Sequence, residues 1–180
     1  MNLQKQQLLF AISGYKHTGK TTLIDKLIPL LKARGYKVAV IKHDGHDFEG
    51  DVPGTDSYKH HQAGAYGSAV FSGKRVLIQK EFEEEGEDAA EDAAGAEANE
   101  ETRKASNHRE RLSEKQEQMA RTIAQAFPEA DIILLEGFKN CSFPQYRCNY
   151  PQEPVIEAEK LADQICEMMR NYRNDAELQE

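Results

Sequence analysis

The octapeptide Gly14–Thr21, GYKHTGKT, is the feature that most constrains the fold of this chain. It fits the pattern GxxxxGK(S/T) and follows an apolar run, Leu8–Ile12, that is typical of a strand buried on both faces. From Lys20 onwards, apolar residues recur at helical spacing until Gly35. Free backbone N–H groups and the positive helix end at such a strand-to-helix turn bind phosphate. The octapeptide therefore predicts a phosphate-binding loop, or P-loop.

Side chains of this loop are expected to complete the site for a nucleoside triphosphate. Lys20 would reach the β- and γ-phosphates, Thr21 would ligate Mg²⁺ and Thr22 would extend the cradle toward the α-phosphate. In the alternative interpretation, Gly14 and Gly19 serve only a tight turn between strand and helix. The residues predicted to bind the nucleotide are Gly14, Lys16, His17, Thr18, Gly19, Lys20, Thr21 and Thr22.

Strands and helices alternate along the remaining chain. Residues 38–41 and 132–135 are further buried apolar runs, and the second of them is the last clear buried strand. Residues 69–71 and 76–78 flank Ser-Gly-Lys, which is a hairpin signal. The pattern predicts an α/β fold, namely a P-loop NTPase-like three-layer domain with a mostly parallel sheet and a β-hairpin excursion.

Three further helices are expected after the first one. The first begins with a cap at Asp56 and runs through Ala65, and the second covers about residues 108–126. The third is a C-terminal helix at residues 154–173, whose apolar stripe is assigned to core packing. These elements are expected to form one nucleotide-binding domain over residues 1–180.

Acidic residues are concentrated in one segment of the chain. The net charge is −8, yet residues 81–101 contain eleven acids and neither Lys nor Arg. Without that segment the chain has 20 acidic and 23 basic residues. Such a run cannot bury enough apolar surface to offset the cost of ordering. Residues 81–104 are therefore predicted to be a disordered low-complexity insert or a lone exposed helix, with a docking arm as the alternative.

Composition also limits the class of protein. No apolar run approaches the roughly 18 residues of a membrane span, and the N-terminus lacks the long apolar region of a secretion signal. Cys141, Cys148 and Cys166 lack CxxC spacing and are expected to be reduced thiols. No basic patch with interleaved aromatic residues is present. We expect a cytoplasmic protein with no membrane and no nucleic-acid partner.

Two acidic residues follow the ends of predicted strands. Asp44 comes shortly after residues 38–41, and Glu136 comes directly after residues 132–135, in the position of a Walker B acid. Parallel strands open onto one crevice at their carboxyl ends, so both carboxylates could converge with Thr21 on one magnesium ion. Lys20, Asp44 and Glu136 are thus the candidate catalytic residues. The alternatives are an Asx-type turn for Asp44 and a solvated glycine cap for Glu136.

Three sequence blocks resemble the MobB family of molybdopterin-guanine dinucleotide biosynthesis adapter proteins. They are GYKHTGKTTL at 14–23, VIKHDGHDFEGDVPGTDSYKHHQAGA at 40–65 and DIILLEGFK at 131–139. The first block is shared by many P-loop proteins, whereas the second is much more specific. After Lys139 the family usually continues through Pro-Lys to a further strand near the base-binding region, but here Phe143–Tyr146 leads into a short tail. The guanine-reading NKxD element is also absent from the chain.

The resemblance implies a GTP-binding, weakly GTP-hydrolysing homodimer that uses GTP and Mg²⁺. Its implied partners are the molybdenum cofactor guanylyltransferase, which joins GMP to molybdopterin, and the molybdopterin cofactor itself. The resemblance also implies that Asp44 and Glu136 face the metal, and that residues 42–54 with the helix from Asp56 line the crevice. It implies phosphate and magnesium binding by Gly14, Gly19, Lys20, Thr21 and Thr22.

Two other functions remain open on the residues alone. One is a small-molecule kinase that uses Asp44 as a base and the crevice histidines to hold an acceptor hydroxyl. Kinases usually bring an arginine-bearing lid over the phosphates, and the Arg-rich segment near the insert is Arg103–Arg111. The other is a nucleotide-gated interaction module that does not hydrolyse its ligand. Neither a zinc site nor covalent catalysis is expected, because the histidine and cysteine spacing fits neither.

Overall fold

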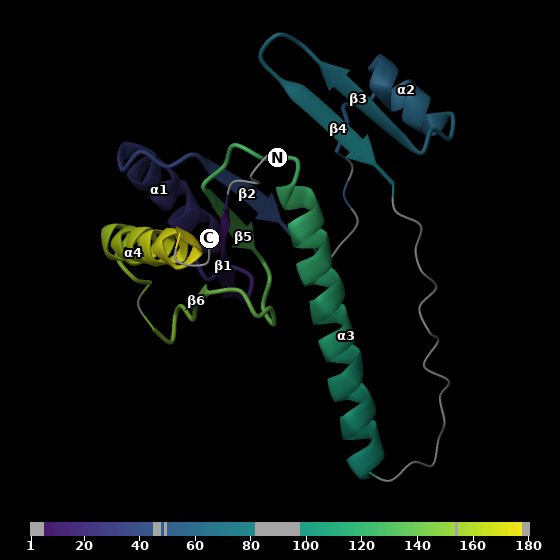
Figure 1. Cartoon of the computed structure of the whole chain (residues 1–180). Coiled ribbons are helices and arrows are strands. Elements are labelled where there is room, and N and C mark those ends of the chain that lie inside the picture. Colours follow the sequence, from purple (N-terminus) through teal and green to yellow (C-terminus); the bar gives the residue numbers. More distant parts are fainter. Residues whose placement is uncertain (1–5, 45–47, 49, 82–97, 154, 178–180) are drawn as a thin grey trace. The chain divides into compact units, whose positions relative to one another are not determined.

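The computed structural model describes residues 6–44, 48, 50–81, 98–153 and 155–177 (Figure 1). The chain forms two compact units, one of Met1–His43 with Glu97–Glu180 and one of Asp44–Ala96. Most of the predicted acidic insert lies outside the described residues, although a helix begins at Ala98 within it. A single domain over residues 1–180 stays a prediction.

The larger unit is built on a four-stranded parallel sheet in the order β2-β5-β1-β6. The central strand β1 (Leu8–Gly14) pairs with β5 (Ile132–Glu136) on one side and with β6 (Gln145–Cys148) on the other. Strand β2 (Val38–Lys42) pairs with β5. The predicted parallel sheet is therefore confirmed, and β1 leads into the P-loop from its interior.

Helices cover both faces of this sheet, as the three-layer prediction requires. Helices α1 (Lys20–Ala33) and α4 (Ala158–Glu177) lie on one face, and α3 (Ala98–Ala124) lies on the other (Figure 1). Adjacent residues of one strand enter opposite cores, because side chains alternate across a strand. Leu134 packs in the core with α1 and α4, whereas Ile133 packs with the alanines of α3.

The sequence patterns did not identify strand β6, which follows the last clearly buried strand, β5. Only four residues long, β6 is an edge strand whose residues Gln145 and Arg147 are exposed while Cys148 is buried. The backbone N–H of Ala11 donates to the carbonyl oxygen of Pro144 at 2.8 Å and begins the pairing. A short polar edge strand carries too little apolar periodicity to be recognised.

The smaller unit contains the predicted hairpin and a short helix. Strands β3 (Gly67–Phe71) and β4 (Val76–Lys80) pair antiparallel, and α2 (Asp56–Gln62) precedes them. The predicted cap at Asp56 is wrong, because the cap is Thr55, whose hydroxyl oxygen accepts the Tyr58 N–H at 3.3 Å.

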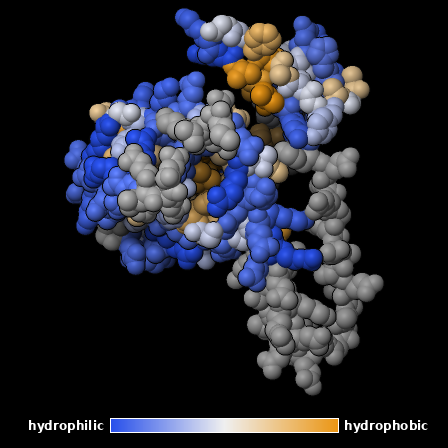
Figure 2. Space-filling view, viewed as in Figure 1, coloured by the Kyte–Doolittle hydropathy of each residue, from blue (hydrophilic) through white to orange (hydrophobic). Residues whose placement is uncertain are grey.

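Large apolar side chains of the hairpin are exposed on both strands. In Figure 2 orange side chains gather on this hairpin. A two-stranded hairpin is marginally stable in water on its own, and within this unit helix α2 contacts β3. The exposed apolar residues of its strands are Val70, Phe71, Val76, Leu77 and Ile78.

Helices of the described part of the chain are all too short or too polar to cross a bilayer.

We expect Leu134→Ala to lower the free energy of unfolding by about 2–5 kcal/mol, because the side chain is fully buried and its loss leaves a cavity. The measurement is urea denaturation followed by circular dichroism. The matched control is Leu112→Ala on α3, where the leucine is 46% exposed and the expected loss is under about 0.5 kcal/mol. Equal losses at the two positions would contradict the assignment of the core.

Candidate functional site

The turn after β1 requires glycine at position 14. Gly14 has a φ of 142° and stands opposite Cys148 in the β1–β6 register. A Cβ atom there would collide with the carbonyl oxygen of Cys148 and would lie 2.8 Å from the Thr18 hydroxyl oxygen. The first glycine of the motif is thus fixed by the close approach of the neighbouring strand.

The loop between Gly14 and helix α1 turns sharply and is tied to itself. His17 and Gly19 have positive φ values of 62° and 85°. Between them, the buried Thr18 hydroxyl donates to the carbonyl oxygen of Tyr15 at 2.8 Å. The Thr18 side chain thus closes the loop, and nucleotide binding through the Thr18 backbone stays a prediction.

Backbone amides at the start of α1 face out of the helix without intrahelical partners. Gly19 is the N-cap residue and provides no side-chain cap, and the first helical bond runs from the Leu23 N–H to the Gly19 carbonyl oxygen at 2.9 Å. The N–H groups of residues 20–22 precede that bond. With the positive end of the helix dipole they form an anion-binding position.

The ammonium group of Lys20 lies across the loop. Its Nζ donates to the carbonyl oxygen of Tyr15 at 2.6 Å. The Tyr15 ring in turn receives the Lys139 ammonium at 4.8 Å from its centroid, which is within cation–π range. Two positive charges therefore flank the same stretch of loop backbone, where they favour an anion.

Thr21 and Glu136 are in direct contact. The Thr21 hydroxyl donates to Glu136 Oε1 at 2.6 Å, and Glu136 is only 8% exposed. The register of β1, β5 and β2 places Glu136 beside Ile12 and Lys42, and the Glu136 carbonyl oxygen accepts the His43 N–H at 2.9 Å. Glu136 is thus held at the carboxyl end of the interior strand β5, beside the P-loop, and is not a solvated cap.

A hydroxyl and a carboxylate are oxygen ligands of the kind that Mg²⁺ takes. No group of three or more His, Cys, Asp or Glu side chains within the described residues is placed to hold a metal ion. A magnesium ion at Thr21 and Glu136 would therefore complete its shell with phosphate and water oxygens, which is its usual coordination at nucleotide sites. The pair fits that role.

The other predicted site residues are less closely assembled. Lys16 and His17 are exposed on the loop, and Thr22 is exposed on the first turn of α1. Asp44 is also exposed and is the first residue of the smaller unit, so its convergence with Glu136 on one metal stays a prediction.

A second wall of the site comes from the segment between β6 and α4, which sequence reasoning did not identify. Together with the P-loop it encloses a cavity of about 470 Å³ whose lining includes Tyr150, Val155 and Glu157. The sequence predicted a helix from residue 154, whereas α4 begins only at Ala158. The residues just before α4 were therefore not considered as part of the site. Recognition of strand β6 would have revealed this wall, because β6 pairs with β1 and returns the chain to the P-loop.

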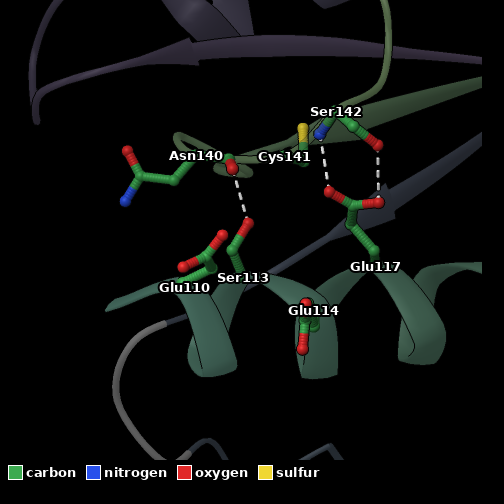
Figure 3. Close-up of a pocket in the computed structure, with 7 residues that line it drawn as sticks. All are labelled: Glu110, Ser113, Glu114, Glu117, Asn140, Cys141 and Ser142. Atoms are coloured by element: carbon green, nitrogen blue, oxygen red, sulfur yellow. Dashed lines mark hydrogen bonds between the residues drawn. The ribbon is translucent and has the colours of Figure 1, made fainter. Parts of the chain in front are cut away.

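A separate cavity of about 620 Å³ lies between α3 and the loop after β5 (Figure 3). Both Glu117 carboxylate oxygens accept hydrogen bonds from Ser142, at 2.6 Å from its N–H and 2.7 Å from its hydroxyl. The Ser113 hydroxyl donates to the Asn140 carbonyl oxygen. Burial raises the pKa of the neighbouring Cys141 thiol, which is therefore neutral. These bonds tie α3 to the loop that leads into β6.

Comparison with known proteins identifies the family. The family model for MobB, described as molybdopterin guanine dinucleotide synthesis protein B, matches residues 9–99, just over half of the chain. The chain belongs to the MobB family. The match includes the P-loop but ends before β5, so Glu136 lies outside the matched residues.

Two similar proteins are molybdopterin-guanine dinucleotide biosynthesis adapter proteins. The one from Escherichia coli (strain K12) is 46% identical over 77 residues, which are 43% of this chain and 44% of that protein. The one from Haemophilus influenzae is 40% identical over 79 residues, 44% of each protein. The chain thus matches less than half the length of these relatives.

A solved structure, Bacillus subtilis MobB, is also similar to this chain. The two have 22% sequence identity, the TM-score is 0.49, and the alignment covers 79% of this chain and 68% of that one.

We expect Thr21→Val to lower the free energy of unfolding by about 1–3 kcal/mol, because it leaves the buried Glu136 carboxylate without the hydroxyl donor. The measurement is chemical denaturation at pH 7 without nucleotide. Thr21→Ser retains the donor and is the control, with an expected loss below about 1 kcal/mol. A Val variant as stable as the Ser variant would show that the Thr21–Glu136 hydrogen bond does not contribute to stability.

Proposed function

We propose that this chain binds GTP with Mg²⁺ at its P-loop, hydrolyses it slowly, and thereby assists the guanylyltransferase that attaches GMP to molybdopterin. The observation that carries the proposal is the Thr21–Glu136 hydrogen bond of 2.6 Å beside the open amides of α1. Membership of the MobB family supports a role in molybdopterin guanine dinucleotide synthesis. The printed names of the similar adapter proteins support the role.

Each residue has a distinct task in this proposal. Residues 20–22 present amides to the phosphates, and the Lys20 ammonium, now bonded to Tyr15, moves to the β- and γ-phosphate oxygens. Thr21 and Glu136 would hold Mg²⁺. The metal supplies positive charge that stabilises the transferring phosphoryl group.

Glu136 is the acid that contacts Thr21 within the described residues, and this fits slow hydrolysis. Glu136 is engaged by Thr21 and serves the metal, so a second group must orient the attacking water. Asp44 is the candidate for that task. Because it belongs to the smaller unit, turnover would respond to anything that orders this unit, such as a bound partner enzyme.

We expect Lys20→Ala to weaken binding of GTP with Mg²⁺ by about tenfold or more, since it removes a charge-assisted phosphate contact that contributes about 1.5–3 kcal/mol. Isothermal titration calorimetry measures the change. The control is Lys32→Ala, which removes a lysine from the last turn of the same helix and should bind like the parent. If Lys20→Ala bound GTP as well as the parent protein, the P-loop interpretation would be wrong.

Product analysis separates this function from the two alternatives. The adapter should release free phosphate slowly, at a rate that its guanylyltransferase changes. A phosphorylated small molecule would favour the kinase, although the proposed Arg103–Arg111 lid belongs to helix α3. Bound GTP that stays intact for hours in a single-turnover assay would favour the interaction module.

We also propose that the chain forms a homodimer through the β3–β4 hairpin. Each strand of this two-stranded sheet has one edge without a strand partner within the described residues. Such edges pair readily with another chain, and apolar side chains such as Leu77 and Ile78 would be buried by the pairing. Pairing of like edges is isologous, which closes a two-fold dimer.

We expect Ile78→Lys to convert the dimer to a monomer at micromolar concentration, because it places a charge among the apolar side chains of the hairpin. Sedimentation velocity measures the mass. Leu112→Lys introduces the same charge on the exposed side of α3 and should leave the dimer intact. A parent protein that stays monomeric, or an Ile78 variant that stays dimeric, would contradict the proposed interface.

A further inference from the structure

We propose that the cavity between the P-loop and a wall formed by Tyr150 and residues 155–158 holds the nucleoside of the bound nucleotide, and that Glu157 makes it selective for guanine. This inference rests on the proposed binding of a triphosphate at the P-loop. It assigns base recognition to a segment outside the residues matched by the family model.

The cavity continues directly from the phosphate site. Its lining includes Gly19, Thr22 and Lys26 from the P-loop and α1. Thr22 is the residue expected beside the α-phosphate, and the ribose is attached to that phosphate. A nucleotide seated on the loop must therefore leave it near Thr22. The cavity volume of about 470 Å³ falls within the usual range of small-molecule sites.

The opposite wall of the cavity offers apolar surface to a purine. Tyr150, Val155 and Ile156 line it. A Cβ atom built on Gly19 would be only 3.5 Å from Val155 Cγ2, so this wall lies close against the P-loop. Purine rings stack on aromatic side chains and pack on aliphatic ones.

This wall is anchored to the core of the larger unit. The backbone N–H of Ile156 donates to the Tyr146 hydroxyl oxygen at 2.9 Å, and Tyr146 belongs to β6. Val155 and Ile156 are half-buried and pack against the core formed with α1 and α4. The wall is therefore positioned by tertiary contacts before any ligand binds, which limits the entropy lost on binding.

Glu157 provides the recognition group. It is the acidic residue among those that line the cavity, and its carboxylate has no hydrogen-bond or ion-pair partner within the described part of the chain. Guanine has two adjacent donors, the N1–H and the exocyclic amine, and both can donate to one carboxylate. Adenine presents an acceptor at N1, which a carboxylate repels. The missing NKxD element would thus have a substitute on a different segment.

A pterin has the same pair of adjacent donors as guanine, so both ligands would suit the carboxylate. Continuity with the P-loop favours the nucleotide over an unphosphorylated pterin, because a nucleotide occupies the phosphate site and this cavity together. The experiment therefore compares GTP with ATP, ITP, XTP, inorganic triphosphate and 6-hydroxymethylpterin. ITP lacks the exocyclic amine, and XTP has a carbonyl oxygen in its place.

Binding of each ligand with Mg²⁺ is measured by calorimetry for the parent and for Glu157→Gln. The parent should bind GTP about tenfold or more tightly than ATP and ITP. Glu157→Gln should lose about tenfold for GTP, gain affinity for XTP because an amide N–H can donate to its carbonyl, and bind inorganic triphosphate unchanged. Glu159→Gln, in the first turn of α4, is the control and should retain the parent preferences.

The outcomes distinguish this inference from the proposed function. Equal affinity of the parent for GTP, ATP and inorganic triphosphate would overturn the nucleoside site and leave the P-loop function standing. If the parent bound no triphosphate at all, both the nucleoside site and the proposed P-loop function would be contradicted. Pterin binding that is weakened by Glu157→Gln but unaffected by Lys20→Ala would assign the cavity to the pterin and overturn the nucleoside assignment.

Discussion

The close parallel pairing of β6 with β1 is the constraint on which the P-loop of this protein depends. It brings the carbonyl oxygen of Cys148 so near to Gly14 that no side chain fits there. The strand must then turn away with a positive φ, and the Thr18–Tyr15 hydrogen bond closes the turn. The open amides at the start of α1 follow directly from that geometry. The proposed phosphate affinity is in this sense a consequence of sheet packing.

Several polar contacts hold the edges of the sheet so that this pairing persists. Glu117 of α3 binds both the N–H and the hydroxyl of Ser142, just before β6 begins. At the other end of β5, the buried Asp131 accepts hydrogen bonds from the Lys37 N–H and from Arg173 of α4. Buried carboxylates that are fully paired position the elements they join, because breaking one bond leaves an unpaired charge. The site thus depends on contacts far from the loop.

How much of the site could be predicted depends on how local each interaction is. The P-loop, its helix and the acid at Glu136 were readable because each follows an apolar run of recognisable period. Strand β6 was not, because its four residues are polar at the exposed edge. Missing β6 also hid the cavity wall at Tyr150 and Val155, which only the return of the chain to β1 brings to the loop. The convergence of Asp44 with Glu136 stays a prediction, because Asp44 belongs to the smaller unit.

The sequence by itself determined the phosphate loop, the α/β pattern, the hairpin and the resemblance to the MobB family. Those features rest on residues near one another in the chain, where turn geometry and side-chain periodicity act directly. Only the tertiary structure decided that Thr21 meets Glu136 across 115 positions, and that Glu157 lines the same crevice as Thr22. Such contacts depend on which strands pair and in what register. Strand pairing is set by the packing of both faces of the sheet rather than by any one segment.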